Sequence, residues 1–213
     1  SPMLRGDLNV IEACQECKVK RMLYTSSIAV EHPESDWYPA WAKRTGEELI
    51  EAMRIQYPKG TKYCIVRPSN VYGRFDDLSK ENLMVVSKLI KEAITTKQII
   101  LDKKGSKQVR DIINAKDVAR GMIRCMEEMP IKPVNLCSGK GTSIEKIAMI
   151  IQDSLLYEIP IVYDNLNLTL GPDKKVMKNP YIEPRVTLKE GIKEVIECQK
   201  QVNVSDVIED IKY

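Results

Sequence analysis

Residues 20–30, KRMLYTSSIAV, hold a short apolar run, Met22 to Tyr24, that ends in a Thr-Ser-Ser turn. Such a run is typical of a strand buried on both faces of a parallel sheet. The preceding LNVIEAC has its apolar residues near helical spacing, and a second helix-like stretch extends from about Trp41 to Gln56. A second apolar run, at 63–66, leads into RPSNVYG. Helix, strand, helix and strand with short connections predict a parallel α/β fold.

The same alternation continues toward the end of the chain. Thr142 and Ser143 can cap a helix, and Glu145 stands near its start, where a negative charge is favourable. No internal repeat or long linker interrupts the pattern. Further helices are expected near 82–95, 117–128, 144–151 and 188–198, and further strands at 98–101, 111–113, 133–137 and 159–164.

Composition and charge favour a globular protein without nucleic-acid or membrane partners. The 33 basic residues nearly cancel the 30 acidic ones, and the net charge of +3 argues against the concentrated basic stripe of a nucleic-acid-binding protein. Only the pI near 8.4 points the other way. No apolar run approaches the roughly 18–20 residues that a membrane-spanning helix needs, and no signal peptide opens the chain. We therefore expect a cytoplasmic protein.

The cysteines give no sign of a metal site. Cys14 and Cys17 form a C-x-x-C pair, but the pair lies inside a helix-like run, and His32 is the only histidine. No second cysteine pair or histidine cluster completes a zinc site. Scattered free thiols fit a reducing, intracellular compartment, and no metal is expected.

Five segments in order resemble the extended short-chain dehydrogenase/reductases, which are the NAD-dependent epimerase/dehydratase family. The end of the chain, from TLGPDKKVM to IKEVIE, also resembles that family's C-terminal region. Within the family, the FDD…ENLMVVSKLI stretch and the tail are most similar to GDP-fucose synthases and nucleotide-sugar 4-epimerases. The five segments are VKRMLYTSSIAV (19–30), WAKRTGEE (41–48), IVRPSNVYGRFDD (65–77), GSKQVRDIINAKDVARGM (105–122) and PVNLCSGKGTSIEKIA (133–148).

The resemblance implies a Rossmann-type parallel sheet with a smaller C-terminal α/β lobe that binds substrate. We expect the Rossmann-type core in residues 1–73 and 98–120, and the substrate-binding lobe in 74–97 and 121–213. The implied cofactor is NAD or NADP, and the implied partner is a nucleoside-diphosphate sugar. The sequence does not tell NAD from NADP, nor does it name the nucleotide or the sugar.

Two features depart from the family pattern. The family holds the cofactor diphosphate with a G-x-x-G-x-x-G turn at a helix N-terminus. That turn is absent, and we expect the dinucleotide-binding part that carries it to precede residue 1. The family also has a Tyr-x-x-x-Lys motif, but four residues before Lys43 stands Pro39, and the nearest tyrosine is Tyr38.

The resemblance assigns roles to nine residues, and most have a structural alternative. Ser27 can be a turn or cap residue, Lys43 a solvated helix residue and Tyr38 an aromatic covering a helix start. Arg110, which would bind phosphate oxygens, can instead pair with Asp111 or Asp117. The implied catalytic residues are Ser27, Lys43 and Tyr38, the cofactor-binding residues Thr25, Lys43, Pro68 and Ser69, and the substrate-binding residues Asn70, Arg110 and Asp173.

The expected function is that of an NAD(P)-dependent nucleotide-sugar epimerase, reductase or dehydratase. The alternative is a non-catalytic regulatory homologue that binds a nucleotide sugar or dinucleotide and has lost the catalytic tyrosine. Relatives commonly pair through a four-helix bundle, so a homodimer through the helices near 8–17 and 41–56 is expected. Leu49, Ile50 and Met53 could belong to that contact or to the core.

Overall fold

The computed structural model describes residues 2–31, 38–165, 176 and 180–210, with side chains for all of these except 2–3 and 200–210. The chain forms two compact α/β units. The first comprises Ser1–Ser69, Val118–Ser138 and Met177–Glu183, and the second Asn70–Asp117, Gly139–Val176 and Pro184–Tyr213. These bounds differ from the expected ones chiefly because 98–117 lie in the second unit and 121–138 in the first.

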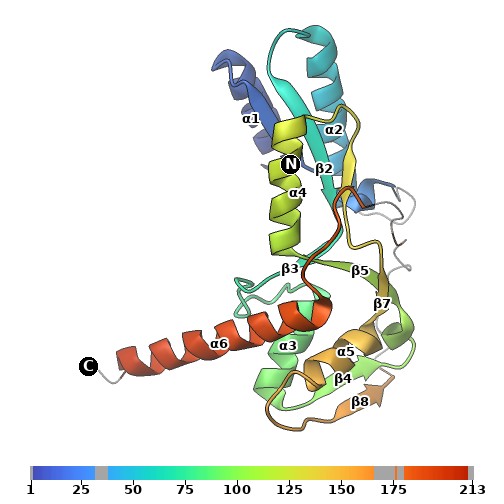
Figure 1. Ribbon diagram of the computed structural model, residues 1–213, viewed down its shortest axis with the longest axis vertical. Helices are drawn as coiled ribbons and strands as arrows, with labels where there is room; N and C mark the ends of the chain where they lie inside the picture. Colours follow the sequence, from blue (N-terminus) through green and yellow to red (C-terminus); the bar gives the residue numbers. More distant parts are fainter. Residues whose placement is uncertain (1, 32–37, 166–175, 177–179, 211–213) are drawn as a thin grey trace. The chain divides into compact units, whose positions relative to one another are not determined.

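The first unit is built on a parallel sheet (Figure 1). Its strand order is β1-β2-β6, with Thr25 beside Val66 and Pro68 beside Leu136. The connections between successive parallel strands pass through helices, as a parallel sheet requires. The elements are α1 (Pro2–Glu16), β1 (Arg21–Thr25), the 3-10 turn η1 (Ile28–Glu31), α2 (Tyr38–Gln56), β2 (Lys62–Pro68), most of α4 (Ala115–Glu128) and β6 (Val134–Leu136).

Helices α1 and α2 share one apolar core with the sheet. Ile11 of α1 and Ile50 of α2 are fully buried against Tyr24, Tyr63 and Ile65. Because side chains alternate along a strand, Cys64 and Val66 point to the opposite face, on which α4 lies (Figure 1). The sheet is therefore covered on both faces, and its central strand is apolar on both.

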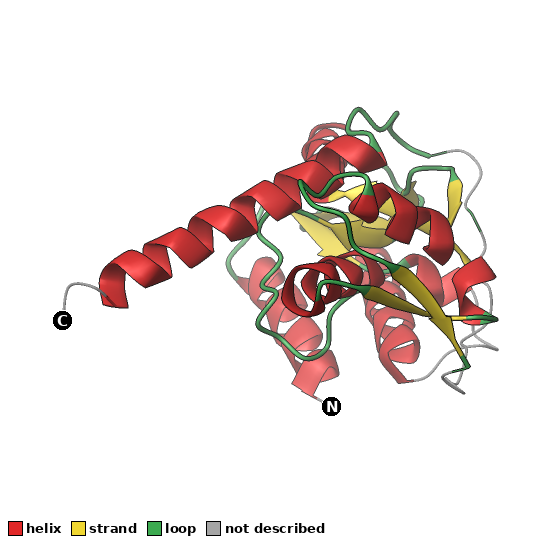
Figure 2. Ribbon diagram, turned by 90° about the horizontal axis from the view of Figure 1, so that it is seen from below, coloured by secondary structure: helices red, strands yellow, loops and turns green. Residues whose placement is uncertain are grey.

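The second unit contains a three-stranded sheet and a two-stranded parallel pair; their strands are among those drawn in yellow in Figure 2. In the order β3-β5-β7, β5 runs parallel to β3 and antiparallel to β7. Strand β4 pairs in parallel with β8. The elements are β3 (Asn70–Tyr72), α3 (Val85–Thr96), β4 (Ile99–Asp102), η3 (Gly105–Lys107), β5 (Val109–Asn114), β7 (Gly141–Ser143), α5 (Ile144–Gln152), β8 (Ile161–Asp164) and α6 (Leu188–Asp210).

A larger apolar core joins α3, α5 and α6 to these strands. Ile90, Ile151 and Ile192, one from each helix, are fully buried in it. Tyr72 lies in the same core, and burial raises the pKa of its hydroxyl to about 12. A side chain at Gly191 would begin 2.1 Å from that hydroxyl, so glycine is what lets α6 approach β3. Tyr72 is therefore a packing residue.

The expected α/β architecture is confirmed, with shifts at several ends. Ser143 is the N-cap of α5 and accepts from the amide of Lys146, as its position predicted. Asn70–Tyr72, where the sequence indicated no strand, form the separate strand β3. Helix α6 continues well beyond Cys198, the end expected from apolar spacing. Among the residues described, no helix is long and apolar enough to cross a membrane.

Candidate functional site

The carboxyl ends of β1 and β2 bring several of the proposed site residues to one edge of the first unit's sheet. Thr25 ends β1 with an exposed side chain, and Pro68 ends β2 two residues beyond the pairing with β1. The amide of Ser26 donates to Val66, and the amide of Ser69 donates to Leu136. In α/β sheets, this edge is where ligands bind.

Ser27 directly precedes η1 and caps it. Its Oγ accepts from the amide of Ala29 at 3.2 Å, and its carbonyl oxygen accepts from the amide of Val30 at 3.2 Å. The turn role that the sequence left open is thus present. This turn role does not use all of the hydrogen-bonding capacity of the Ser27 side chain, because a hydroxyl that accepts one hydrogen bond can still donate another.

Lys43 lies on α2 beside the end of β1. Its Nζ is 5.0 Å from the centre of the Tyr24 ring, and Tyr24 immediately precedes Thr25. The Tyr24 ring fits against α2 because the neighbouring helix position is Gly46, where a Cβ would lie 2.1 Å from the Tyr24 hydroxyl. The ammonium group is therefore held near the same edge of the sheet as Thr25 and Ser27.

Tyr24 itself is unsuited to acid/base chemistry. Its hydroxyl donates to Asp7 Oδ2 at 2.9 Å. Burial, and then the hydrogen bond to Asp7, raise the pKa of Tyr24 far above its ordinary value. General acid/base catalysis needs the opposite, a pKa shifted toward the working pH. The tyrosine beside Lys43 therefore serves to join β1, α1 and α2.

Tyr38 opens α2, and its side chain is 56 % exposed. Tyr38 and Lys43 lie on one continuous helix and are five residues apart, which places their side chains about 140° apart around the helix axis. The four-residue spacing of the family's Tyr-x-x-x-Lys motif would place them only about 40° apart. This geometry counts against Tyr38 as the partner of Lys43. Its catalytic role stays a prediction.

An ion-pair cluster next to this edge was not anticipated from the sequence. Arg67 of β2 donates through Nε to Glu47 Oε1 at 2.9 Å and through Nη1 to Glu31 Oε1 at 2.9 Å, and its Nη2 also contacts Glu47. Glu47 is buried, and its hydrogen bond holds the pKa of the Arg67 guanidinium above its usual value. Two features of the sequence could have indicated this ion-pair cluster: an arginine directly after the apolar run CIV, and a glutamate on the inner face of a helix.

Ser69 and Asn70 lie on either side of the boundary between the two units. Asn70 is buried in β3, and its Nδ2 donates to the carbonyl oxygen of Asp111 at 2.8 Å. That bond holds β3 to β5, next to the ladder pair Asn70–Ile112. The amide oxygen of Asn70 keeps acceptor capacity, so the bond leaves a substrate role open.

Arg110 lies on β5 in the second unit. Its Nη1 donates to the carbonyl oxygen of Val109 at 2.9 Å, and its Nη2 donates to Gln108 Oε1 at 2.7 Å. The two fully buried carboxylates that the sequence offered as partners hold backbone amides. Asp111 accepts from Gly139, and Asp117 accepts from Arg185 and Val186. Asp173, the remaining substrate candidate, lies outside the described residues.

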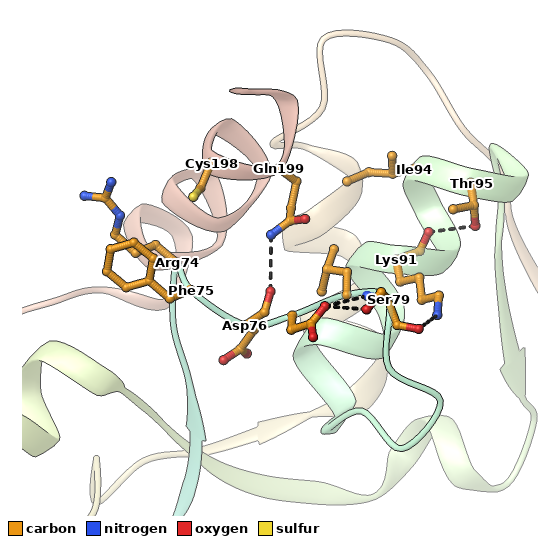
Figure 3. A pocket seen from close by; sticks show the side chains of 11 residues that line it. Arg74, Phe75, Asp76, Ser79, Lys91, Ile94, Thr95, Cys198 and Gln199 are labelled. Carbon is orange, nitrogen blue, oxygen red and sulfur yellow. Dashed lines mark hydrogen bonds between the residues drawn. The ribbon is translucent and has the colours of Figure 1, made fainter. Parts of the chain in front are cut away.

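A pocket of about 510 Å³ in the second unit is lined by the 74–79 loop, α3 and α6 (Figure 3). Its polar groups largely satisfy one another: Lys91 donates to the carbonyl oxygens of Ser79 and Lys80, and Gln199 donates to that of Asp76. No proposed site residue in the described part of the chain lines it. This pocket is therefore separate from the residues assigned above.

The cysteines are free thiols, and Cys64 and Cys125 are buried. Burial raises the pKa of the Cys125 thiol to about 11 and also raises that of Cys64, so neither is an activated nucleophile. Within the described ranges, no three His, Cys, Asp or Glu side chains gather in a group that could hold a metal ion.

Comparison with known proteins gives consistent matches. Residues 3–137 match the model of the NAD dependent epimerase/dehydratase family. A curated relative from Methanocaldococcus jannaschii, provisionally named as a UDP-glucose 4-epimerase, is 26 % identical over 93 % of this chain and 69 % of its own length.

Two solved structures show the same fold at low sequence identity. The UDP-glucose 4-epimerase of Thermotoga maritima, solved with UDP-glucose, has a TM-score of 0.80 and 22 % identity over 92 % of this chain and 69 % of its own. The GDP-L-fucose synthetase of Naegleria fowleri bound to NADP has a TM-score of 0.74 and 20 % identity over 93 % of this chain and 70 % of its own.

Proposed function

Because the chain belongs to the NAD dependent epimerase/dehydratase family, we propose that it transfers a hydride at a sugar carbon of a nucleoside-diphosphate sugar. The reaction is an epimerisation, reduction or dehydration. The relatives named above, whose names refer to UDP-glucose and GDP-L-fucose, support this substrate class. The observation that carries the proposal is the Lys43 ammonium beside the end of β1, in the first unit that also presents Thr25 and Ser27.

The proposed cofactor is NAD or NADP. When bound, the nicotinamide supplies the hydride chemistry. The donors at this edge, two hydroxyls from Thr25 and Ser69 and the Lys43 ammonium, suit the ribose hydroxyls and carboxamide of a nicotinamide riboside, and Pro68 offers an apolar surface for the ring. The sequence contains no G-x-x-G-x-x-G turn, so this fit concerns the nicotinamide end alone.

In the proposed mechanism, Ser27 donates its hydroxyl proton in a hydrogen bond to the sugar oxygen at the reacting carbon. Lys43 would hold the ribose of the nicotinamide riboside. Tyr38 is the candidate for exchanging the proton. On the substrate side, we assign Asn70, Arg110 and Asp173 to the sugar and the diphosphate, because a guanidinium fork matches phosphate oxygens.

A second function is favoured by the geometry of α2. If the helix that carries both Tyr38 and Lys43 persists when ligands bind, the two side chains stay on different faces, and no acid/base tyrosine joins Lys43. The chain would then be a regulatory homologue that binds a nucleotide sugar or dinucleotide without turning it over.

The test is to incubate the purified protein with UDP-, GDP- and dTDP-sugars and NAD(H) or NADP(H). Product is followed by nuclear magnetic resonance of the sugar and by absorbance of the reduced nicotinamide. We expect turnover, and we expect Ser27→Ala and Lys43→Met each to lower kcat/KM by about a hundredfold or more. Tyr38→Phe tests the proton-exchange role.

The matched controls are Lys62→Met, at the exposed start of β2, and Tyr57→Phe, just beyond α2; both should retain activity. Turnover that survives in Tyr38→Phe would remove Tyr38 from the mechanism. Calorimetric binding of a nucleotide sugar or dinucleotide without turnover would establish the regulatory alternative. Neither turnover nor binding would overturn both functions.

A further inference from the structure

Arg67 joins three elements at the edge of the sheet where the proposed catalytic residues stand. It belongs to β2, Glu31 ends η1, and Glu47 lies on α2. We propose that Arg67 is a positioning residue, which fixes the turn that carries Ser27 relative to the helix that carries Lys43. This inference deepens the proposed function and rests on it for its catalytic consequence.

The link to Ser27 runs through η1. Ser27 caps this turn, and Glu31, its last residue, accepts from Arg67 Nη1 at 2.9 Å. A second contact ties η1 to α2, because the Arg44 guanidinium on α2 donates to the carbonyl oxygen of Val30. The one-turn helix after Ser27 is thus held from β2 at one point and from α2 at another.

The link to Lys43 runs through the rotation of α2. Glu47 stands four residues after Lys43, so the two side chains lie on the same face about one turn apart. The paired contact of Nε and Nη2 with the Glu47 carboxylate has the planar fork geometry that fixes orientation as well as distance. Holding Glu47 therefore fixes which way Lys43 points.

The charges make the arrangement sensitive to a single substitution. Glu47 is buried and Glu31 is partly buried, and one guanidinium pairs with both carboxylates. Without it, two negative charges would face each other in a poorly solvated place, and α2 and η1 would move apart or draw in water. Displacements of about 1 Å at catalytic groups can lower turnover by about a hundredfold.

The chain contains a matched control at the opposite end of the same strand. Arg54 of α2 contacts Glu51 and donates through Nη2 to the carbonyl oxygen of Tyr63 at 2.7 Å, so it also ties α2 to β2. The side chains of Arg54 and Arg67 are 17 % and 19 % exposed. Tyr63 lies four residues before Arg67, about 13 Å along the strand. Both arginines bridge the same two elements, but only Arg67 stands near Ser27.

The experiment compares Arg67→Met, Arg67→Lys and Arg54→Met in the full chain. Hydrogen exchange should show faster exchange at 28–31 and 43–47 in Arg67→Met, and at 50–56 in Arg54→Met. In turnover assays, Arg67→Met should lower kcat by about a hundredfold with KM changed less than about threefold. Arg67→Lys keeps the charge without the fork, so its kcat should lie between those of the wild type and Arg67→Met. Arg54→Met should keep the wild-type kcat.

Equal acceleration of exchange at 28–31 in both methionine variants would overturn the inference, as would a wild-type kcat in Arg67→Met. If the wild-type protein turns over no nucleotide sugar, the proposed function fails, and hydrogen exchange alone decides the positioning role. In that case, faster exchange confined to 28–31 and 43–47 in Arg67→Met would support the positioning role of Arg67.

Discussion

At the scale of single residues, Arg110 is the sharpest test of the proposed substrate. Its guanidinium donates to Gln108 and to the Val109 carbonyl, both close in sequence, and a guanidinium fork is suited to phosphate oxygens. We predict that Arg110→Ala weakens nucleotide-sugar binding by about 2 kcal/mol, about thirtyfold, and barely changes the melting temperature of the ligand-free protein. Titration calorimetry with UDP, GDP and CDP sugars, together with thermal melts, measures both effects.

The control is Arg74→Ala in the same unit, where the arginine stacks on Phe75 and lies 3.8 Å from Glu194. This variant should bind as the wild type does. An unchanged dissociation constant in Arg110→Ala would refute the phosphate role. A lower melting temperature with unchanged affinity would show instead that Arg110 serves the fold.

At the scale of elements, the start of α6 is stabilised by a capping box. Thr187 donates through its amide and hydroxyl to Glu190 Oε2, and the Glu190 amide donates back to the Thr187 hydroxyl. These bonds hold the pKa of Glu190 below its ordinary 4.5, so their stabilisation is present above that pH and is lost as the pH falls through the lowered pKa. We predict that Thr187→Ala lowers the melting temperature by about 2–4 °C at pH 7 and by less near pH 3.

Ser143→Ala, which removes the N-cap of α5, is the matched control, because that hydroxyl accepts from a backbone amide and has no titrating partner in the bond. Its loss of melting temperature should be similar at both pH values. A Thr187→Ala deficit that does not shrink in acid would contradict the role given to the Glu190 carboxylate.

At the scale of the whole molecule, we predict a homodimer that pairs through α1 and α2. Ile50 is buried in the core of the first unit, and Leu49 and Met53 are partly buried against it. The outer faces still carry exposed apolar side chains, including Val10 at 53 %. Sedimentation at micromolar concentration should show a dimer for the wild type and a monomer for Val10→Glu, since a buried unpaired carboxylate opposes association.

Ile123→Glu is the control for the dimer, because Ile123 is similarly exposed, at 61 %, but lies on α4. This variant should sediment as the wild type does. A wild-type monomer at micromolar concentration, or a dimer that persists in Val10→Glu, would refute this interface.

Local sequence patterns predicted the helices and six of the eight strands that the structure describes, in their order along the chain. Apolar spacing, the run CIV and the cap at Ser143 are local signals, because each depends on residues within one or two turns or strand lengths. They predicted the α/β class and the polar turn after β1, but not the short strands β3 and β7. The end of α6 was missed, since the apolar spacing from which it was judged fades after Cys198 while the backbone remains helical.

The pairing of distant segments is set by the packing of the fold, and local sequence patterns do not reveal it. Arg67 meets Glu31 and Glu47, which stand 36 and 20 residues away, and Asp117 holds the amides of Arg185 and Val186, 68 and 69 residues away. A charged residue in a sequence carries no mark of its partner, because the partner is chosen by which elements pack together and by the cost of burying an unpaired charge. The same packing placed Tyr24, a residue of an apolar strand, between Asp7 and Lys43.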